Sequence, residues 1–388
     1  MPLWILFWAP LLLLAWVYVL YPLVALAMSR LRPVRLVAGD RRPKLVTVGI
    51  AVHDGAPEIE DRLADVFAQS PPFELEVIVA SDGSTDGTVA AVERYAAADP
   101  RVRLIDLPRV GQSAAQSRIF AAASGEVVVL TDVQTRYAER CLEELVAPFA
   151  DDRVGCTTGI LRWQYDRRTQ TAYHEGLYWR FEQRVRAWES RAGWLAAGTG
   201  ALLASRRSLF RPVEAHASLD QMLPLIAREA NLLVLARPLA VGIDRGTMSL
   251  VDQFRSRTRI ATQGIEANLR MAMRITPWRR PGTALTIWSH KLLRWATPWL
   301  AAIAAAAGGA LFAGGEPAWF LVPAAAAVVL GLAATVGYIG WRVGKPLPIV
   351  GFALTIAAIN LAFTVAWVNV LLRRRVGTWE VAAETADR

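Results

Sequence analysis

The sequence predicts an α/β domain with a mostly parallel sheet, placed between one N-terminal and two to three C-terminal transmembrane helices. Two observations lead to this prediction. Between residues 45 and 130, short runs rich in β-branched residues alternate with stretches of helical periodicity, as in strands joined by helices. Long apolar runs lie near both ends of the chain, whereas the middle has the composition of an ordinary globular domain.

Composition and charge favour a membrane enzyme over a nucleic-acid-binding protein. Of the 388 residues, 54% are hydrophobic, which is rare in a purely soluble enzyme. The net charge is +9, but the basic residues cluster beside the apolar runs and form no continuous stripe, so we expect no nucleic-acid partner. Two cysteines, Cys141 and Cys156, argue against a disulfide scaffold and fit a reducing compartment.

Residues 1–30 are predicted to form an N-terminal anchor. The uncharged run at 3–28 exceeds the roughly 20 residues that span hydrocarbon. A cleaved signal peptide is the alternative, because Ala25-Leu26-Ala27 resembles a cleavage site, but the run is long and no basic residue precedes it. Basic residues that follow a span tend to stay cytosolic, so we expect the next domain to face the cytosol. These basic residues are Arg30, Arg32, Arg35, Arg41, Arg42 and Lys44.

The C-terminal region 293–375 contains apolar runs at 294–313, 317–340 and 347–372. If all three cross the membrane, the basic residues near Arg342 and those at 373–375 lie on opposite faces. The last run contains Pro348, Asn360 and Asn369, so a re-entrant or interfacial path is the alternative. Residues 251–292 are predicted to be interface helices or a linker, and 376–388 a cytosolic or flexible tail.

The soluble domain is predicted to cover 38–250, and its first half has a regular order of elements. In parallel sheets ligands bind beyond the carboxyl ends of the strands, so chemistry is expected at the residues that follow each strand. The predicted strands are 45–52, 75–80, 102–107 and 126–130, and the predicted helices are 57–69, 88–97 and 112–123.

Three polar clusters follow these strands. His53-Asp54-Gly55 comes after the first strand, and the octapeptide Ser81-Asp82-Gly83-Ser84-Thr85-Asp86-Gly87-Thr88 links the second strand to a helix. Glycines allow tight turns there, and Ser or Asp can cap the helix. Thr131-Asp132-Val133-Gln134-Thr135 closes the fourth strand. Acidic groups at that place could hold a divalent cation against a diphosphate.

On these motifs, the run from Val46 to Gly159 resembles the family 2 glycosyltransferases of the GT-A type. That family pattern is a strand ending in Tyr-Asn-Glu, then Asp-Asp-Gly-Ser-Thr-Asp-Gly-Thr, then Asp-x-Asp, and the octapeptide at 81–88 is the most specific match. Gly198-Thr199-Gly200-Ala201 is similar to the small-residue loop on the acceptor side. Leu219-Asp220-Gln221 stands in place of the acidic motif that supplies the base. The flanking spans suit the membrane-embedded, polysaccharide-synthase-like branch.

The resemblance implies a role for each matching residue. His53, Asp54, Asp82 and Gly83 would bind the nucleotide. Asp132 would hold the diphosphate and, with Gln134, a Mg²⁺ or Mn²⁺ ion. Asp220 would be the catalytic base. The residues that complete the implied substrate site are Gly198, Thr199, Gly200 and Arg257.

Several positions depart from the family pattern. His53-Asp54-Gly55 replaces Tyr-Asn-Glu, Gln134 replaces the second metal-binding Asp, and Leu219 replaces the acidic neighbour of the base. A neutral carbonyl is a poorer ligand than a carboxylate for a hard cation. The Gln-x-x-Arg-Trp motif of processive synthases is absent, and Arg255, Arg257 and Arg259 stand in its place, so long processive synthesis is not favoured.

The function expected from the sequence is that of an inverting glycosyltransferase at the cytosolic face of a bacterial inner membrane. It would move a sugar from a nucleotide-sugar donor, expected to be a UDP-sugar, to a saccharide or lipid-linked acceptor. Membrane lipids and other envelope polysaccharide assembly proteins are the further partners considered. The alternative is a catalytically silent relative that binds a nucleotide or scaffolds such an assembly.

Overall fold

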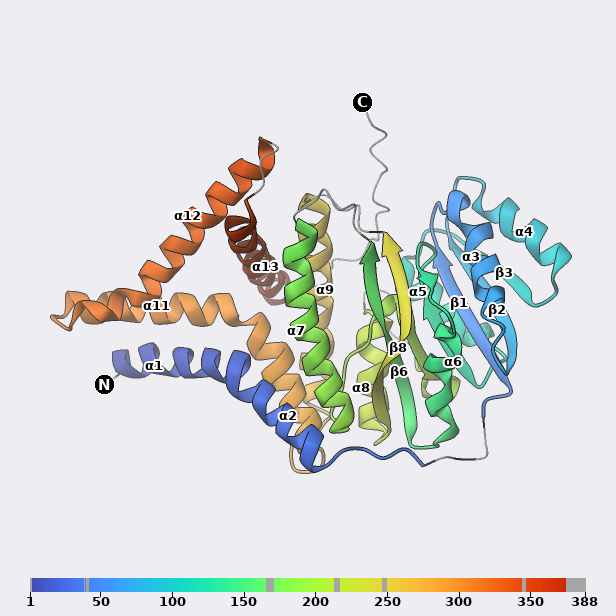
Figure 1. Cartoon of the computed structure of the whole chain (residues 1–388), viewed down its shortest axis with the longest axis horizontal. Coiled ribbons are helices and arrows are strands. Elements are labelled where there is room, and N and C mark those ends of the chain that lie inside the picture. Colours follow the sequence, from blue (N-terminus) through green and yellow to red (C-terminus); the bar gives the residue numbers. More distant parts are fainter. Residues whose placement is uncertain are drawn as a thin grey trace.

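The computed structural model describes residues 2–37, 39, 42–164, 171–212, 217–245, 250–343 and 347–374. Arg41, Lys345, Arg375 and the predicted tail at 376–388 lie outside these described residues. The α/β domain lies on one side of the molecule, and long helices from both ends of the chain gather on the other (Figure 1). The predicted combination of an α/β domain with apolar helices is confirmed.

The first half of the domain forms the predicted parallel unit. Its strands are hydrogen-bonded in the order β3-β2-β1-β4, and every neighbouring pair is parallel. The helices between them act as the crossover connections that parallel strands require. The elements are β1 (Leu45–Val52), α3 (Ala56–Ala68), β2 (Glu74–Asp82), α4 (Thr88–Ala98), β3 (Val102–Leu107), α5 (Gln112–Ala122) and β4 (Val127–Thr131).

The second half makes the sheet mixed. β7 (Leu203–Arg206) runs antiparallel between β4 and β6 (Val154–Gln164), while β8 (Leu233–Arg245) is parallel to β6. β5 (Arg136–Tyr137) is antiparallel to β8 at the far edge. The helices of this half are α6 (Cys141–Val146), α7 (Thr171–Arg191) and α8 (Leu219–Glu229), with 3₁₀ turns at Ala147–Ala150, Gly200–Leu202 and Arg207–Leu209.

Alternating side chains of the strands build one apolar core on each face of the sheet. Val48 and Ile50 of β1 pack in the core that contains Ile59 of α3, while Ile78 of β2 packs in the core that contains Ile119 of α5. This separation follows from the two-residue period of a strand, which sends successive side chains to opposite faces. Because a slip of one residue would exchange the two faces, these cores fix the register of the strands.

Three helices among the described residues are long and apolar enough to cross a membrane: Pro2–Leu31, Ala318–Arg342 and Ile349–Leu371. The first comprises α1 (Pro2–Ala15), a π-helical turn (Trp16–Leu20) and α2 (Tyr21–Leu31). The other two contain α12 (Val322–Arg342), preceded by a 3₁₀ turn (Ala318–Leu321), and α13 (Pro348–Leu371). One N-terminal and two C-terminal candidate spans agree with the sequence prediction.

The break in the C-terminal helices lies earlier than the sequence suggested. α13 is one continuous helix, whereas the pair Pro281–Leu293 and Thr297–Ala313 is bent by 63° and reaches spanning length only as a pair. Pro298 at the start of α11 (Thr297–Ala313) has no amide hydrogen, which suits a helix that begins there. The segment before the bend contains α9 (Leu250–Ala272), α10 (Pro281–Leu285) and a π-helix (Thr286–Leu293).

The membrane helices and the α/β domain are joined by direct contacts. After α2 the chain follows the domain surface, where the amide of Val34 donates to the carbonyl of Arg191 at 2.7 Å and that of Val37 to Oδ2 of Asp151 at 2.9 Å. On the other side, residues of α13 share an apolar core with α8 and α9. The N-terminal helix runs beside α11 in Figure 1.

Candidate functional site

The polar clusters predicted from the sequence lie at one edge of the sheet. Val52 of β1 is in register with Ser81 of β2, and Ile50 of β1 with Thr131 of β4. Because these strands are parallel and in register, the residues that follow them emerge together. The loops beginning at His53, Gly83 and Asp132 therefore share the carboxyl edge of the sheet.

Asp82 is fully buried, and the chain itself supplies hydrogen bonds to both of its carboxylate oxygens. Oδ1 accepts from the amides of Val110 at 2.6 Å and Gly111 at 2.8 Å, while Oδ2 pairs with Arg109 at 3.1 Å. Gly83 follows with a φ of +66°, and a Cβ there would stand 2.8 Å from the backbone nitrogen of Arg109, so glycine is required. The carboxylate of Asp82 thus holds the 109–111 loop against the strand ends.

His53 and Asp54 are tied to the same octapeptide. Nδ1 of His53 lies 2.9 Å from the carbonyl oxygen of Asp82, and the amide of Thr85 donates to Oδ1 of Asp54 at 2.7 Å. The backbone of Asp54 has a φ of +49°, a region that Asp tolerates better than most side chains. Asp86, two residues before the start of α4, accepts from the amide of Thr88 at 2.9 Å. These bonds fix the mutual position of the two loops.

Asp132 lies where several charges converge. Burial, followed by the carboxylates of Asp244 and Asp220, raises the pKa of Asp132 to about 6, with Arg259 and Arg62 acting in the opposite direction. Nε2 of Gln112 lies 3.4 Å from Oδ1 of Asp132. The three carboxylates come from the loop after β4, from α8 and from β8, so the fold gathers acids that are far apart in the sequence. A carboxyl pKa raised by burial and by neighbouring acids is a common sign of a functional site.

Asp244 is the acid that sequence reasoning missed. It is 4% exposed and belongs to β8, whose Ile243 pairs with Arg136 of β5. Continuing this antiparallel register by one residue places Asp244 opposite Thr135, close to the predicted metal motif. Gln134, which was predicted as a metal ligand, is exposed to solvent. No motif in the sequence pointed to Asp244, because its partner strand β5 has just two residues.

Asp220 lies in the first turn of α8, against the small-residue loop. A Cβ on Gly200 would stand 3.3 Å from Oδ2 of Asp220, and one on Gly198 would stand 2.9 Å from its carbonyl oxygen. Oγ of Ser218 donates to Oδ1 of Asp220. The structure thus brings the predicted acceptor loop to the predicted base. Leu219, which replaces the family's second acid, is fully buried in the core under the sheet.

The loop is held from behind by Arg186 of α7. NH1 of Arg186 donates to Oγ1 of Thr199 at 3.0 Å, and NH2 donates to the carbonyl oxygen of Ala197 at 3.3 Å. Burial lowers the pKa of Arg186, although Glu182, Glu189 and Asp220 act to raise it. Arg186 was not predicted as a site residue. Its position on a helix far from the family motifs left no pattern by which to find it.

Two arginines of α9 bear on the predicted site. Arg259 is among the charges that act on Asp132, in the direction that lowers its pKa, and Arg257 is the residue predicted to contact the diphosphate. Arg257 is partly buried and has interactions of its own. A role for Arg257 toward the diphosphate stays a prediction.

The carboxylates fit a divalent cation held jointly with a diphosphate. Within the part of the chain that the structure describes, no group of three or more His, Cys, Asp and Glu side chains could enclose a metal ion alone. Asp132 and Asp244 nevertheless offer the hard oxygen ligands that Mg²⁺ and Mn²⁺ prefer. Magnesium sites commonly use one or two carboxylates plus substrate phosphates, and this pair meets that requirement.

Cys141 and Cys156 are free and buried, away from these chemical groups. Burial raises the pKa of each thiol to about 12, so neither sulfur is a ready nucleophile. Their place in the core agrees with the absence of a disulfide scaffold expected from the sequence.

Comparison with known proteins identifies the domain. Residues 47–213 match the family described as Glycosyl transferase family 2. An N-acetylglucosaminyltransferase of Rhizobium meliloti (strain 1021) is 28% identical over 251 residues, which cover 62% of this chain and 55% of that protein. The succinoglycan biosynthesis protein ExoA of the same organism is 34% identical over 105 residues, which cover 26% and 32% of the two chains. The chain thus spans less than two thirds of the length of these relatives.

A solved structure shows the same fold over nearly the whole chain. The mannosyltransferase PcManGT of Pyrobaculum calidifontis, in complex with GDP-Man and Mn²⁺, has a TM-score of 0.69 and 23% identity, covering 95% of this chain and 99% of that one. The family match and the fold together indicate a glycosyltransferase domain of the GT-A type. Residues 47–213 form a family 2 glycosyltransferase domain, as the sequence resemblance implied.

Proposed function

We propose that this protein is an inverting glycosyltransferase that moves a sugar from a UDP-sugar to a saccharide or lipid-linked acceptor at the cytosolic face of a membrane. The observation that carries the proposal is the convergence of Asp220 and Asp132. Asp220 lies beside the predicted acceptor loop, and Asp132 lies beside the predicted diphosphate site. The negative charge of Asp220 acts on Asp132 and raises its pKa.

Asp220 is the proposed base. Gly200 keeps space open beside its carboxylate for an acceptor hydroxyl, because a Cβ there would stand 3.3 Å from Oδ2 of Asp220. The carboxylate takes the hydroxyl proton as the oxygen attacks the anomeric carbon, opposite the departing nucleoside diphosphate. A single in-line displacement inverts the anomeric configuration.

The negative charge that develops on the leaving diphosphate is stabilised by groups at the diphosphate site, away from the base. We assign Asp132, with Asp244, to a divalent cation, which supplies positive charge to the diphosphate when it is bound. Arg259 approaches the same place and adds a cation from the chain itself. The loops at His53, Asp54 and Gly83 are proposed to hold the nucleoside, with Asp82 securing the 109–111 loop beside them.

The membrane orientation is part of the same proposal. Arg30, Arg32 and Arg35 lie at the end of α2 where the chain passes onto the α/β domain, since Val34 bonds to Arg191. Basic residues beside a span favour the cytosolic side, which is where nucleotide sugars are made available. Anionic membrane lipids are proposed partners of these residues, and other envelope polysaccharide assembly proteins are proposed partners of the enzyme.

The test is release of nucleoside diphosphate by the full chain in detergent. The chain is incubated with a panel of nucleotide sugars, with and without Mg²⁺ or Mn²⁺. We expect turnover with a UDP-sugar that needs the cation, and a loss of about 10²-fold or more in Asp220→Asn because proton transfer is removed. Asp152→Asn, at an exposed and distant carboxylate, is the matched control and should retain full activity. Absence of turnover with every donor would favour a nucleotide-binding scaffold instead.

A further inference from the structure

The loop beside Asp220 is a single layer of backbone between α7 and α8. Thr199 has extended backbone angles, with φ at −121° and ψ at 116°, and in an extended chain alternate residues face opposite sides. Gly198 and Gly200 accordingly lie against Asp220 of α8. Thr199, between them, faces Arg186 of α7. The proposed base and a buried arginine therefore lie on opposite sides of the same short segment.

Arg186 holds this segment, the 197–200 loop, at two points. Its NH1 donates to Oγ1 of Thr199 at 3.0 Å, and its NH2 donates to the carbonyl oxygen of Ala197 at 3.3 Å. The amide of Thr199 donates in turn to Oγ1 of Thr158 on β6 at 3.0 Å. Because a guanidinium presents its donors in a rigid planar arrangement, the two bonds fix the orientation of the loop as well as its position.

The charge of Arg186 is not explained by these two hydrogen bonds alone. The side chain is 3% exposed, and its Nε has no partner among the described residues. Burial of a charge is costly, and neutral donors would satisfy a hydroxyl and a carbonyl at lower cost. The carboxylates that act on this charge are Glu182, Glu189 and, across the loop, Asp220. Attraction between Arg186 and Asp220 therefore favours contact between the loop and the proposed base.

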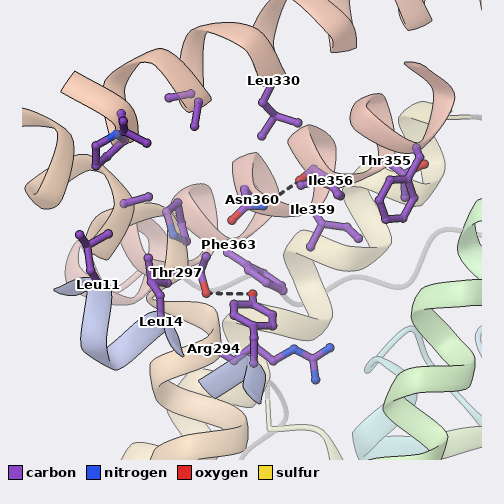
Figure 2. Close-up of a pocket in the computed structure, with 18 of the residues that line it drawn as sticks. Leu11, Leu14, Arg294, Thr297, Leu330, Thr355, Ile356, Ile359, Asn360 and Phe363 are labelled. Atoms are coloured by element: carbon purple, nitrogen blue, oxygen red, sulfur yellow. Dashed lines mark hydrogen bonds between the residues drawn. The ribbon is translucent and has the colours of Figure 1, made fainter. Parts of the chain in front are cut away.

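One turn before Arg186, α7 is joined to the membrane helices through Glu182. Its carboxylate pairs with Arg294, which lies between the π-helix and α11. Arg294 borders an apolar cavity of about 1070 Å³ between the membrane helices. Its guanidinium is directed away from Leu11 and Leu14 of the cavity wall (Figure 2). The arginine therefore serves as a link from the membrane helices to α7.

The next turn of α7 is fixed in the same way through Glu189. This carboxylate accepts from the hydroxyl of Tyr21 in the N-terminal helix and lies 2.6 Å from Nδ1 of His290. Nε2 of the same imidazole lies 3.0 Å from Glu182. Arg186 is thus flanked on α7 by two buried carboxylates that contact helices from both ends of the chain. Because breaking such buried pairs is costly, α7 keeps a fixed position relative to the membrane helices.

We propose that Arg186 is a positioning residue of the sugar transfer, which holds the 197–200 loop against the carboxylate of Asp220 from a helix fixed to the membrane helices. The inference rests on the proposed function and goes beyond it, because it assigns a role to a residue outside the family motifs. In this role Arg186 acts through the loop and not by contact with the substrate. A loosened loop would take away the wall that Gly200 forms beside Oδ2 of Asp220.

The first test is Thr199→Val, which removes the hydroxyl that Arg186 holds and leaves the buried charges in place. The full chain in detergent is given the UDP-sugar that the wild type uses, with water as the acceptor, and release of UDP is followed. We expect kcat to fall by about tenfold, because the base is less well placed for proton transfer. The KM for the UDP-sugar should stay within about twofold, because the loop lies on the side of the base and not of the diphosphate.

A double-mutant cycle tests whether the two residues act through their shared hydrogen bond. Arg186→Met should lower kcat by about 10²-fold, and Arg186→Lys, which keeps the cation, should recover part of that loss. Adding Thr199→Val to Arg186→Met should slow the enzyme by no more than about a further twofold. Full multiplication of the two effects would show that Thr199 and Arg186 act separately, and would overturn the proposal.

A second buried arginine provides a matched control. Nε of Arg228 on α8 donates to Oγ1 of Thr283 at 2.9 Å, and both side chains are buried. Arg228 lies eight residues after Asp220, about 12 Å along the helix axis, so the pair is remote from the base. Thr283→Val should therefore lower the thermal midpoint as Thr199→Val does, with kcat unchanged. An equal fall of kcat in both variants would assign the effect to lost stability and overturn the proposal.

Hydrogen exchange gives a readout that needs no turnover. Amides of the 197–200 loop should exchange about tenfold faster in Thr199→Val than in the wild type, because a hydrogen bond to a charged group is lost. Faster exchange without a fall in kcat would show that Arg186 orders the loop but not the base, and would remove this inference alone. A wild type that releases UDP from no UDP-sugar would instead count against the transferase, and the positioning role would fall with it.

Discussion

Gly111 donates its backbone amide to Oδ1 of Asp82 at 2.8 Å, which joins the end of β2 to the start of α5. The same oxygen accepts the amide of Val110 at 2.6 Å. An acid of the octapeptide motif therefore shapes the loop that precedes α5. Asp82 could therefore position this loop or contact the nucleotide-sugar donor. The two roles can be measured independently.

Asp82→Asn is expected to lower the free energy of unfolding by about 3 kcal/mol, because hydrogen bonds to a buried charged group are lost. The measurement is the thermal midpoint of the full chain in detergent. Asp152→Asn, whose side chain is 83% exposed, should change stability by less than about 0.5 kcal/mol. Unchanged stability in Asp82→Asn together with lost UDP binding would instead assign the carboxylate to the donor.

Gly200→Ala should impair use of the acceptor more than binding of the donor. The new Cβ would stand 3.3 Å from Oδ2 of Asp220 and occupy space proposed for the acceptor hydroxyl. We expect a fall of about tenfold or more in kcat/KM for the acceptor, with an unchanged Kd for UDP. Gly309→Ala is the control, since a Cβ there meets nothing within 4 Å. Equal effects of the two substitutions would show that the acceptor does not approach Gly200.

Mn²⁺ affinity in the presence of UDP should depend on pH through Asp132. The pKa of this carboxyl is raised to about 6, mainly by burial and by Asp244 and Asp220, so it is protonated below that pH and must lose its proton to bind a cation. Affinity should rise by about tenfold per pH unit below the midpoint and level off above it. Electron paramagnetic resonance of free Mn²⁺ measures this, and Asp132→Asn should abolish the dependence.

Asp244→Asn should shift the same titration to lower pH. Loss of a neighbouring negative charge makes Asp132 easier to ionise, so its pKa falls. Well above the midpoint, Mn²⁺ affinity should drop by about tenfold if Asp244 is also a ligand. Gln134→Ala should alter neither quantity, because the side chain is neutral and exposed. A larger effect of Gln134→Ala than of Asp244→Asn would restore the metal motif expected from the sequence.

Tyr21→Phe tests how the N-terminal helix is attached to the domain. The buried hydroxyl of Tyr21 donates to Glu189 of α7, so its removal should cost about 1 to 3 kcal/mol of stability. Tyr18→Phe is a matched control, since Tyr18 is 41% exposed and its hydroxyl lies 3.0 Å from Oγ1 of Thr297. Differential scanning fluorimetry in detergent compares them, and equal shifts would mean that the Tyr21 contact contributes little.

Local patterns were enough to predict the first half of the domain. The strand 45–52 has its predicted boundaries, and the helix predicted at 88–97 starts at Thr88 and ends at Ala98, because hydrophobic alternation and turn residues are properties of short segments. The octapeptide located loops at the carboxyl edge of the sheet for the same reason. Asp220 and the loop at Gly198–Gly200 lie side by side, and the roles that the resemblance implies for them stay predictions.

Longer-range features could not be predicted. Asp244 joins Asp132 only because β8 pairs with β5, a pairing of two residues that leaves no pattern in the sequence. Arg186 supports the loop at Gly198–Gly200 from a helix with no family motif. Asn360 and Asn369 suggested a break within the last apolar run. In the structure the bend lies between the π-helix and α11, before Thr297.

The sequence by itself determined the alternating strands and helices, the apolar character of the terminal helices and the acids that follow the strands. Each of these features depends only on residues that are close together in the chain. Only the tertiary structure decided which acids meet around Asp132, which cation supports the acceptor loop and where a cavity opens between the membrane helices. Those features depend on contacts between distant segments, and such contacts are set by the packing of the whole chain.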